Sequence, residues 1–134
     1  MSACPCASGH DYAACCGRYL SGKALPPTAE ALMRSRFSAF TKQNANYLVA
    51  TLLPAKRERN ELKTIQKSFR GILWVKLEVL ATEQGGENDE RGVVEFRAHW
   101  QAAAGREKGS LHERSTFVKQ GDRWYYEDGE QFPG

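Results

Sequence analysis

Hydrophobic and polar residues alternate along four tracts in the second half of the chain, at 73–79, 94–100, 111–117 and 123–128. A period of two residues is that of a half-buried β-strand, whose successive side chains point to opposite faces of a sheet. The polar tract GGENDERG at 85–92 predicts a hairpin connection. The pattern therefore predicts four antiparallel strands in chain order. In the first strand it predicts a buried face formed by Leu73, Val75, Leu77 and Val79.

The first half of the chain follows a helical period instead. Thr28 is placed to cap a helix that runs to about residue 40, with hydrophobic residues along one broad face. Further helical segments are expected at about 44–53, before Pro54, and at about 58–70. Helices followed by an antiparallel meander predict the α+β class, with the helices packed on a four-stranded sheet.

An arginine falls in the middle of the hydrophobic face of the first of these helices. Burying Arg36 without a partner would cost too much free energy, because its charge would lose its hydration. Strand alternation puts two acidic residues, Glu113 and Asp128, on hydrophobic faces of the sheet. We therefore expect Arg36 to pair with Glu113, Asp128 or both, at a candidate pocket between helix and sheet.

The first sixteen residues contain all the cysteines of the chain, Cys4, Cys6, Cys15 and Cys16. A disulfide would need an oxidising compartment, and the N-terminus shows no secretory signal. A redox pair would normally be C-x-x-C beside a βαβ pattern, which is not found here. Four thiolates in one short segment suit a closed tetrahedral site, so we predict structural zinc, with free or redox-active thiols as the alternative. His10 would be a fifth ligand candidate, and we interpret it as a residue beside the site or on the surface.

The run CPCASGHDYAACCG resembles the SEC-C motif, a zinc-binding knuckle found in the tail of the SecA translocation ATPase. With LMRSRFSAF at 32–40, ERSTF and RWYYEDG, the chain resembles the YchJ-like family of uncharacterised bacterial proteins. The resemblance implies zinc ligation by the four cysteines. It also implies a core domain similar to nuclear transport factor 2, in which a curved sheet forms a cone-shaped, cystatin-like arrangement with the helices. We accordingly divide the chain into a knuckle at 1–22 and a core domain at 28–134.

The sequence departs from the usual motif in ways that bear on its partners. Ala7 and His10 stand where glycine and lysine are usual, and the flanking basic residues are absent, which weakens the analogy to the SecA tail and its acidic chaperone partner. The chain is unevenly charged, since residues 1–60 carry eight Lys/Arg against three Asp/Glu. This asymmetry would attract an acidic partner or nucleic acid, but scattered solvated charge is the preferred interpretation, because no nucleic-acid-binding motif accompanies it.

Together these features predict a cytoplasmic zinc-binding protein whose knuckle docks another protein. No hydrophobic run approaches the length of a membrane span, so no membrane association is expected. The alternative is a small-molecule binder, or an enzyme of hydrolase or isomerase type, that uses the pocket around Arg36, Glu113 and Asp128. We favour a structural ion network there over catalysis, because the pattern assigns no histidine, thiol or serine nucleophile to the pocket. The sequence predicts no particular oligomeric state.

Overall fold

The structure is a computed structural model that describes residues 2–133. Its helical segments all precede the sheet, and their bounds are η1 (Tyr12–Ala14), α1 (Cys16–Leu20), α2 (Ala29–Lys42), α3 (Ala45–Ala50), η2 (Pro54–Lys56) and α4 (Glu61–Ser68). The strands follow as β1 (Ile72–Gln84), β2 (Arg91–Ala102), β3 (Lys108–Gln120) and β4 (Arg123–Phe132). The order of elements confirms the α+β prediction.

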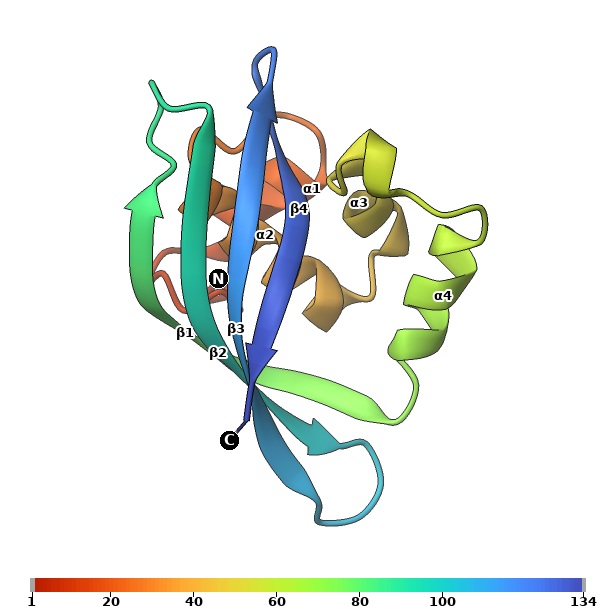
Figure 1. Ribbon diagram of the computed structural model, residues 1–134. Coiled ribbons are helices and arrows are strands. Elements are labelled where there is room, and N and C mark those ends of the chain that lie inside the picture. Colours follow the sequence, from red (N-terminus) through yellow and green to blue (C-terminus); the bar gives the residue numbers. More distant parts are fainter. Residues whose placement is uncertain (1, 134) are drawn as a thin grey trace.

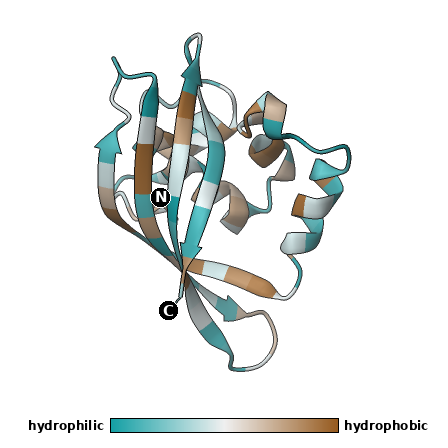
Figure 2. Cartoon of the chain, viewed as in Figure 1, coloured by the Kyte–Doolittle hydropathy of each residue, from teal (hydrophilic) through white to brown (hydrophobic). Residues whose placement is uncertain are grey.

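The four strands form an antiparallel meander with the spatial order β1-β2-β3-β4. The sheet is strongly twisted; in Figure 1, α1 and α2 lie behind it, and α3 lies to the right of β4. Bands of hydrophobic and hydrophilic residues alternate along the strands in Figure 2, as the period of two requires. The fold is therefore a curved sheet with one face packed against helices and the other open to water.

Helix α2 is the element that connects the sheet to the rest of the chain. Its N-cap is Thr28, whose Oγ1 accepts a hydrogen bond from the Ala31 N–H at 3.0 Å, as predicted. The Ala29 N–H donates to the carbonyl of Gly85 at the base of the β1–β2 hairpin, 2.9 Å away. A Cβ atom on Gly92 would lie only 3.0 Å from that of Ala29, so this close approach requires glycine. These contacts fix the start of α2 against the sheet.

The main core lies between α2 and the concave face of the sheet. Its fully buried members include Leu32 from α2, Val94 from β2, Phe117 from β3 and Trp124 from β4. The Trp124 indole N–H donates to the Pro27 carbonyl at 3.2 Å, so this large side chain is packed and hydrogen-bonded at once. Alternation correctly predicted the buried faces of β2 and β3.

The predicted buried face of β1 is wrong at its beginning. Leu73 and Val75 are 44% and 52% exposed, whereas Leu77 is only 2% exposed. The reason is a register shift between Trp74 and Lys76, which inserts one extra residue into β1 opposite β2. The inserted residue reverses the alternation, so Trp74 instead of its neighbours turns toward the core.

The N-terminal segment is part of the same core and not an appendage beside it. Cys4, Cys6 and Cys16 are buried in one cluster with Leu32 and Phe37 of α2. In the part of the chain that the structure describes, no helix is both long and hydrophobic enough to cross a membrane.

Candidate functional site

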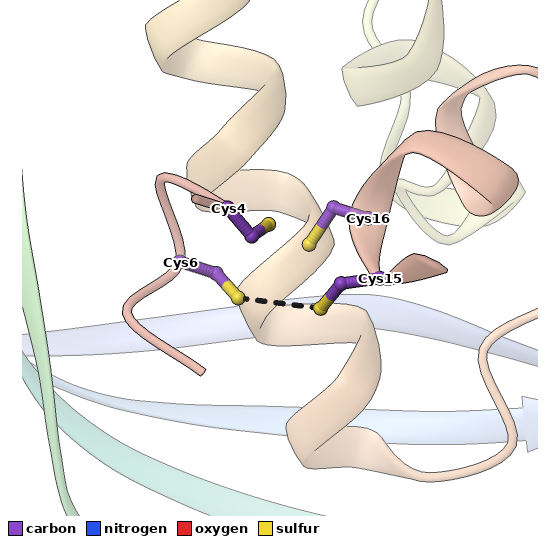
Figure 3. A group of neighbouring side chains, drawn as sticks. All are labelled: Cys4, Cys6, Cys15 and Cys16. Atoms are coloured by element: carbon purple, nitrogen blue, oxygen red, sulfur yellow. Dashed lines mark hydrogen bonds between the residues drawn. The ribbon is translucent and has the colours of Figure 1, made fainter. Parts of the chain in front are cut away.

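The four cysteine sulfurs converge on one point next to α2. All four Sγ atoms lie within 4.8 Å of one another. Figure 3 shows the four side chains pointing toward a common point. A tetrahedral zinc site with Zn–S bonds of about 2.3 Å has sulfurs about 3.8 Å apart, so the spacing suits such an ion. None of the cysteines forms a disulfide, and the Sγ atoms of Cys6 and Cys15 are 3.6 Å apart. The predicted ligands are therefore together, and the donor set fits a thiophilic metal ion.

Local backbone structure explains how so short a segment places four ligands. The Cys4 N–H donates to the His10 carbonyl at 2.9 Å, and the Tyr12 N–H donates to the Ser2 carbonyl at the same distance. These bonds fold residues 2–12 into a tight loop that carries the first two cysteines. The 3₁₀ turn η1 and helix α1 then present the second pair, since Cys16 is the first residue of α1. The loop and the start of α1 thus face each other across the cysteine cluster.

The electrostatics of the cluster favour a cation. The pKa of the Cys6 thiol is lowered to about 4, chiefly because Cys16 donates a hydrogen bond to its sulfur. The same hydrogen bond and burial raise the pKa of Cys16, and burial raises the pKa of Cys15. One thiolate can therefore form without a metal, but further ionisation would bring negative sulfurs side by side. A divalent cation removes that repulsion, and metal binding then releases the remaining protons.

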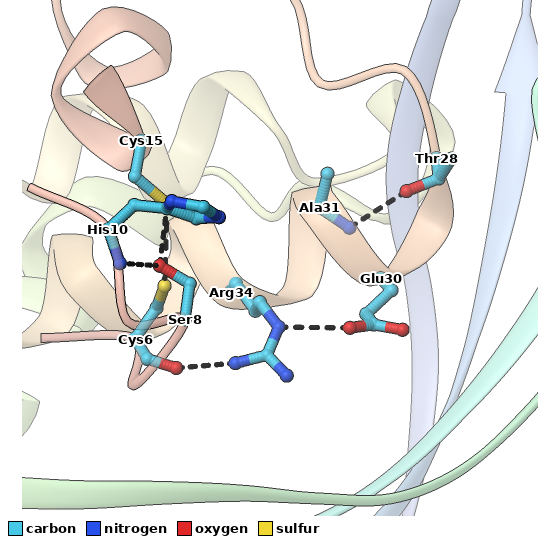
Figure 4. A network of polar contacts seen from close by, with 8 residues as sticks. All are labelled: Cys6, Ser8, His10, Cys15, Thr28, Glu30, Ala31 and Arg34. Carbon is cyan, nitrogen blue, oxygen red and sulfur yellow. Dashed lines mark hydrogen bonds and ion pairs between the residues drawn. The ribbon is translucent and has the colours of Figure 1, made fainter. Parts of the chain in front are cut away.

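Helix α2 supports the cluster with polar side chains. Arg34 Nη1 donates to the Cys6 carbonyl at 2.6 Å, while Arg34 Nε donates to Glu30 at 3.0 Å. Figure 4 shows both contacts. On the next turn of the helix, Ser38 Oγ lies 3.6 Å from Cys4 Sγ. Such contacts orient metal ligands and disperse the charge of thiolates. Sequence reasoning missed Arg34 and Ser38 because their role depends on the knuckle docking on α2.

His10 is not among the converging ligands. Its side chain is exposed, and its backbone N–H donates to Ser8 Oγ at 3.2 Å. Ser8 Oγ in turn lies 3.2 Å from Cys15 Sγ. The interpretation of His10 as a residue beside the site or on the surface agrees with this geometry.

Arg36 is buried on the side of α2 that faces the sheet, as its helical position predicted. Its Nη1 donates to the Leu48 carbonyl at 2.9 Å and to Thr51 Oγ1 at 2.6 Å. Its guanidinium carbon lies 4.6 Å from the centre of the Tyr126 ring, an attractive cation–π distance. Desolvation lowers the pKa of Arg36 to about 10, so it remains charged at neutral pH. Carbonyl, hydroxyl and aromatic groups therefore stabilise a charge that we expected carboxylates to balance directly.

Glu113 lies in the same region but forms no ion pair with Arg36. Its Oε2 accepts hydrogen bonds from Ser115 Oγ at 2.5 Å and from the Tyr126 hydroxyl at 3.1 Å. A Cβ atom on Gly129 would collide with this carboxylate, so the glycine makes room for it. Tyr126 thus contacts both charged groups. Burial raises the pKa of Tyr126 most, and the nearby charge of Glu113 raises it further.

The expected pairing of Arg36 with Asp128 is wrong. Thr116 of β3 pairs with Asp128, whereas the next residue, Phe117, pairs with Tyr126. β4 therefore contains one extra residue at this point. This bulge turns Asp128 to the outer face, where it is exposed. Of the three candidate pocket residues, the fold brings Arg36 and Glu113 together and leaves Asp128 outside.

A cavity of about 240 Å³ lies between α2 and the sheet. Arg36 and Glu113 contribute to its wall, but Phe117 and Trp124, which could have filled it, pack elsewhere in the core. The remaining lining residues are Met33, Phe37, Phe40, Trp74, Phe96, Ala98, Leu111, Tyr126 and Gln131. The cavity is thus mostly hydrophobic, with a polar end.

Known proteins match both parts of this structure. Residues 2–18 match the SEC-C motif, and residues 28–129 match the family described as the YchJ middle NTF2-like domain. A UPF0225 protein of Photorhabdus laumondii is 43% identical over 126 residues, which cover 94% of this chain and 79% of the relative. A UPF0225 protein of Chromobacterium violaceum is 44% identical over 129 residues, covering 96% and 92% of the two chains.

Two solved structures share the fold. A SEC-C motif containing protein from Rhodopseudomonas palustris superposes with a TM-score of 0.86 at 35% identity, covering 97% of this chain and 98% of that protein. Another from Psychrobacter arcticus gives a TM-score of 0.74 at 31% identity, covering 93% and 80%. The matches span the knuckle and the core together, and the chain therefore belongs to the YchJ family of UPF0225 proteins, with an N-terminal SEC-C motif.

Proposed function

We propose that the four cysteines hold one structural zinc ion and that the metal-bound knuckle is a docking surface for another protein. The convergence of four sulfur atoms is the observation that carries the first part. Four thiolate ligands complete a tetrahedral zinc site and leave no position for a substrate or a reactive water. The metal would therefore shape a surface and not perform catalysis. Free thiols suit the reducing cytoplasm, which is the location we propose.

The docking role is supported by what the knuckle leaves exposed. Its inner side packs against α2, whereas Ala7, His10, Ala13 and Ala14 point outward and are exposed. Small side chains let another backbone approach closely, and the nearby Arg18 adds positive charge. A protein partner would fit this exposed surface of small side chains better than nucleic acid would, because no basic stripe accompanies it.

Site-specific photo-crosslinking tests the docking role. A photoreactive amino acid at Ala13 should capture one defined partner in cells with normal zinc. Capture should fall when the metal ligand Cys15 is replaced by serine, because the docking surface then loses its shape. The same probe at exposed Glu107, in the hairpin between β2 and β3, serves as the control. Equal capture from both positions, or a capture yield that Cys15→Ser leaves unchanged, would exclude the knuckle as the docking surface.

A second function is favoured by a different observation. The cavity between α2 and the sheet is large enough for a small molecule and contains a buried charge of each sign. We propose that it binds a small ligand. We favour binding over catalysis because no histidine or cysteine lines the cavity among the described residues.

A further inference from the structure

The polar end of the cavity carries groups with unused hydrogen-bonding capacity. Both hydrogen bonds of the Arg36 guanidinium leave from Nη1, so Nε and Nη2 keep N–H groups for another acceptor. Every fully buried side-chain nitrogen and oxygen among residues 2–133 has a hydrogen-bond partner. The free N–H groups must therefore reach accessible space, and the cavity that Arg36 lines is that space.

Glu113 supplies the complementary acceptor. Both of its hydrogen bonds end on Oε2, and Oε1 has none within the part of the chain that the structure describes. The cavity thus offers N–H donors from α2 and a carboxylate oxygen from β3, and Tyr126 contacts both of these groups. The two charges oppose each other, so a ligand with a net charge would meet one repulsive group whichever sign it carried.

The rest of the cavity selects for a flat hydrophobic body. Phe37 and Phe40 line it from α2, Trp74 from β1 and Phe96 from β2. Aromatic walls of this kind favour a ligand that stacks against them. A cavity of about 150 Å³ accommodates benzene, so the volume of about 240 Å³ found here suits a molecule of roughly two fused rings.

We propose that this cavity binds an uncharged, flat molecule of about two rings in which a carbonyl stands next to an N–H group, as in a cyclic amide. The carbonyl oxygen accepts from Arg36, the N–H group donates to Glu113 Oε1, and the rings lie among the aromatic side chains. The inference rests on the proposed small-molecule function of the cavity and names the class of ligand for it.

Three probes of similar size test the proposal by calorimetry on the zinc-loaded full chain. Quinolin-2-one carries the adjacent carbonyl and N–H groups, its N-methyl derivative lacks the donor, and 2-naphthoate replaces the amide with a negative charge. Quinolin-2-one should bind at least about tenfold more tightly than either of the others, because only it satisfies both protein groups. In Glu113→Gln, the affinity advantage of quinolin-2-one over 2-naphthoate should fall by a similar factor. The reason is that no negative charge then opposes the charge of Arg36.

A filled cavity provides the structural control. Leu111→Trp should abolish binding of all probes, while Leu80→Trp, on an exposed part of β1 outside the cavity, should leave it unchanged. Binding that survives Leu111→Trp, or no binding of any probe, would contradict the small-molecule function itself. Equal or tighter binding of 2-naphthoate or the N-methyl compound would leave that function standing and overturn the cyclic-amide class.

Discussion

Single side chains of α2 connect the cysteine cluster to the rest of the molecule, and Ser38 is the clearest case. Its hydroxyl lies on the buried side of the helix, next to Cys4 Sγ. Removing the hydroxyl would leave Cys4 Sγ without this contact in the buried part of the cysteine cluster. Ser38 thus lies beside the proposed metal site although it is no ligand.

We expect Ser38→Ala to weaken zinc binding by about 10- to 100-fold, the usual effect of losing an outer hydrogen bond at a metal site. Competition with a chromophoric chelator would measure the affinity. Ser68→Ala is the control, because Ser68 is a helical serine on exposed α4 whose Oγ donates to the Ile65 carbonyl and contacts no cysteine. Equal zinc affinity of the Ser38 variant and the control would exclude this role.

Thr51 shows how the fold accommodates a buried arginine. Its Oγ1 accepts from Arg36 Nη1 and donates to the Tyr47 carbonyl at 2.8 Å. We expect Thr51→Val, which keeps the shape but removes the hydroxyl, to lower the free energy of unfolding by about 1–3 kcal/mol. Urea denaturation would measure it, with exposed Thr64→Val as the control. A loss no greater than that of the control would contradict the importance of this contact.

At the scale of elements, the strand predictions succeeded where alternation is unbroken and failed at the bulges. β2 and β3 pair in continuous register, and their buried faces could be predicted from the sequence. One extra residue in β1 exposes Val75, and one in β4 moves Asp128 to the outer face. A bulge leaves no simple mark in a hydrophobic pattern, because its position is set by the pairing of two strands. The Arg36–Asp128 pairing was wrong for this reason.

Contacts between charged side chains on the outer face of the sheet make the stability of the folded protein depend on pH. His112 Nε2 lies 2.8 Å from Glu95 Oε2 across β2 and β3, and Arg114 donates to the other oxygen at 3.1 Å. These contacts, that of His112 first, lower the pKa of Glu95 in the folded protein. The folded state therefore binds the carboxyl proton less readily than the unfolded chain does. The resulting stabilisation is present above the unfolded pKa of about 4.3 and is lost as the pH falls through the folded pKa.

We therefore expect Glu95→Gln to be less stable than the native chain at pH 7. The difference should shrink progressively as the pH is lowered from 7 to 3, because the native carboxyl becomes protonated as the pH falls through the folded pKa of Glu95. Thermal unfolding of the two proteins at matched pH would show this. Glu107→Gln, in the exposed hairpin between β2 and β3, should differ little from the native chain at either pH. A difference for Glu95→Gln that stays constant from pH 7 to pH 3 would contradict the electrostatic explanation.

For the whole molecule, the cysteine cluster and the core are one structure. A shared site for the four cysteines could be anticipated from the sequence, because closely spaced cysteines in a short segment commonly bind one metal ion. Their burial against Leu32 and Phe37 could not, because it depends on how residues 2–20 pack on α2. Zinc binding contributes on the order of 10 kcal/mol to the folding of short metal-binding segments. Loss of the metal should therefore affect the core as well as the knuckle.

Hydrogen exchange tests that connection. Chelation of the metal should remove amide protection from α1 and reduce it in the neighbouring turns of α2, while β2 and β3 stay protected. A Cys4→Ser/Cys16→Ser variant, already unable to hold the ion, should show no further change on chelation. Loss of protection confined to residues 2–20 would show that the knuckle is energetically independent of the core.

The central claim is that this chain holds one zinc ion through Cys4, Cys6, Cys15 and Cys16. Zinc K-edge absorption spectroscopy, combined with metal analysis of the purified protein, tests it most directly. The proposed function predicts about one zinc per chain, surrounded by four sulfur atoms at about 2.3 Å, and a clear loss of zinc in Cys15→Ser. A native protein without zinc, a first shell containing nitrogen or oxygen, or unchanged zinc in Cys15→Ser would contradict the account.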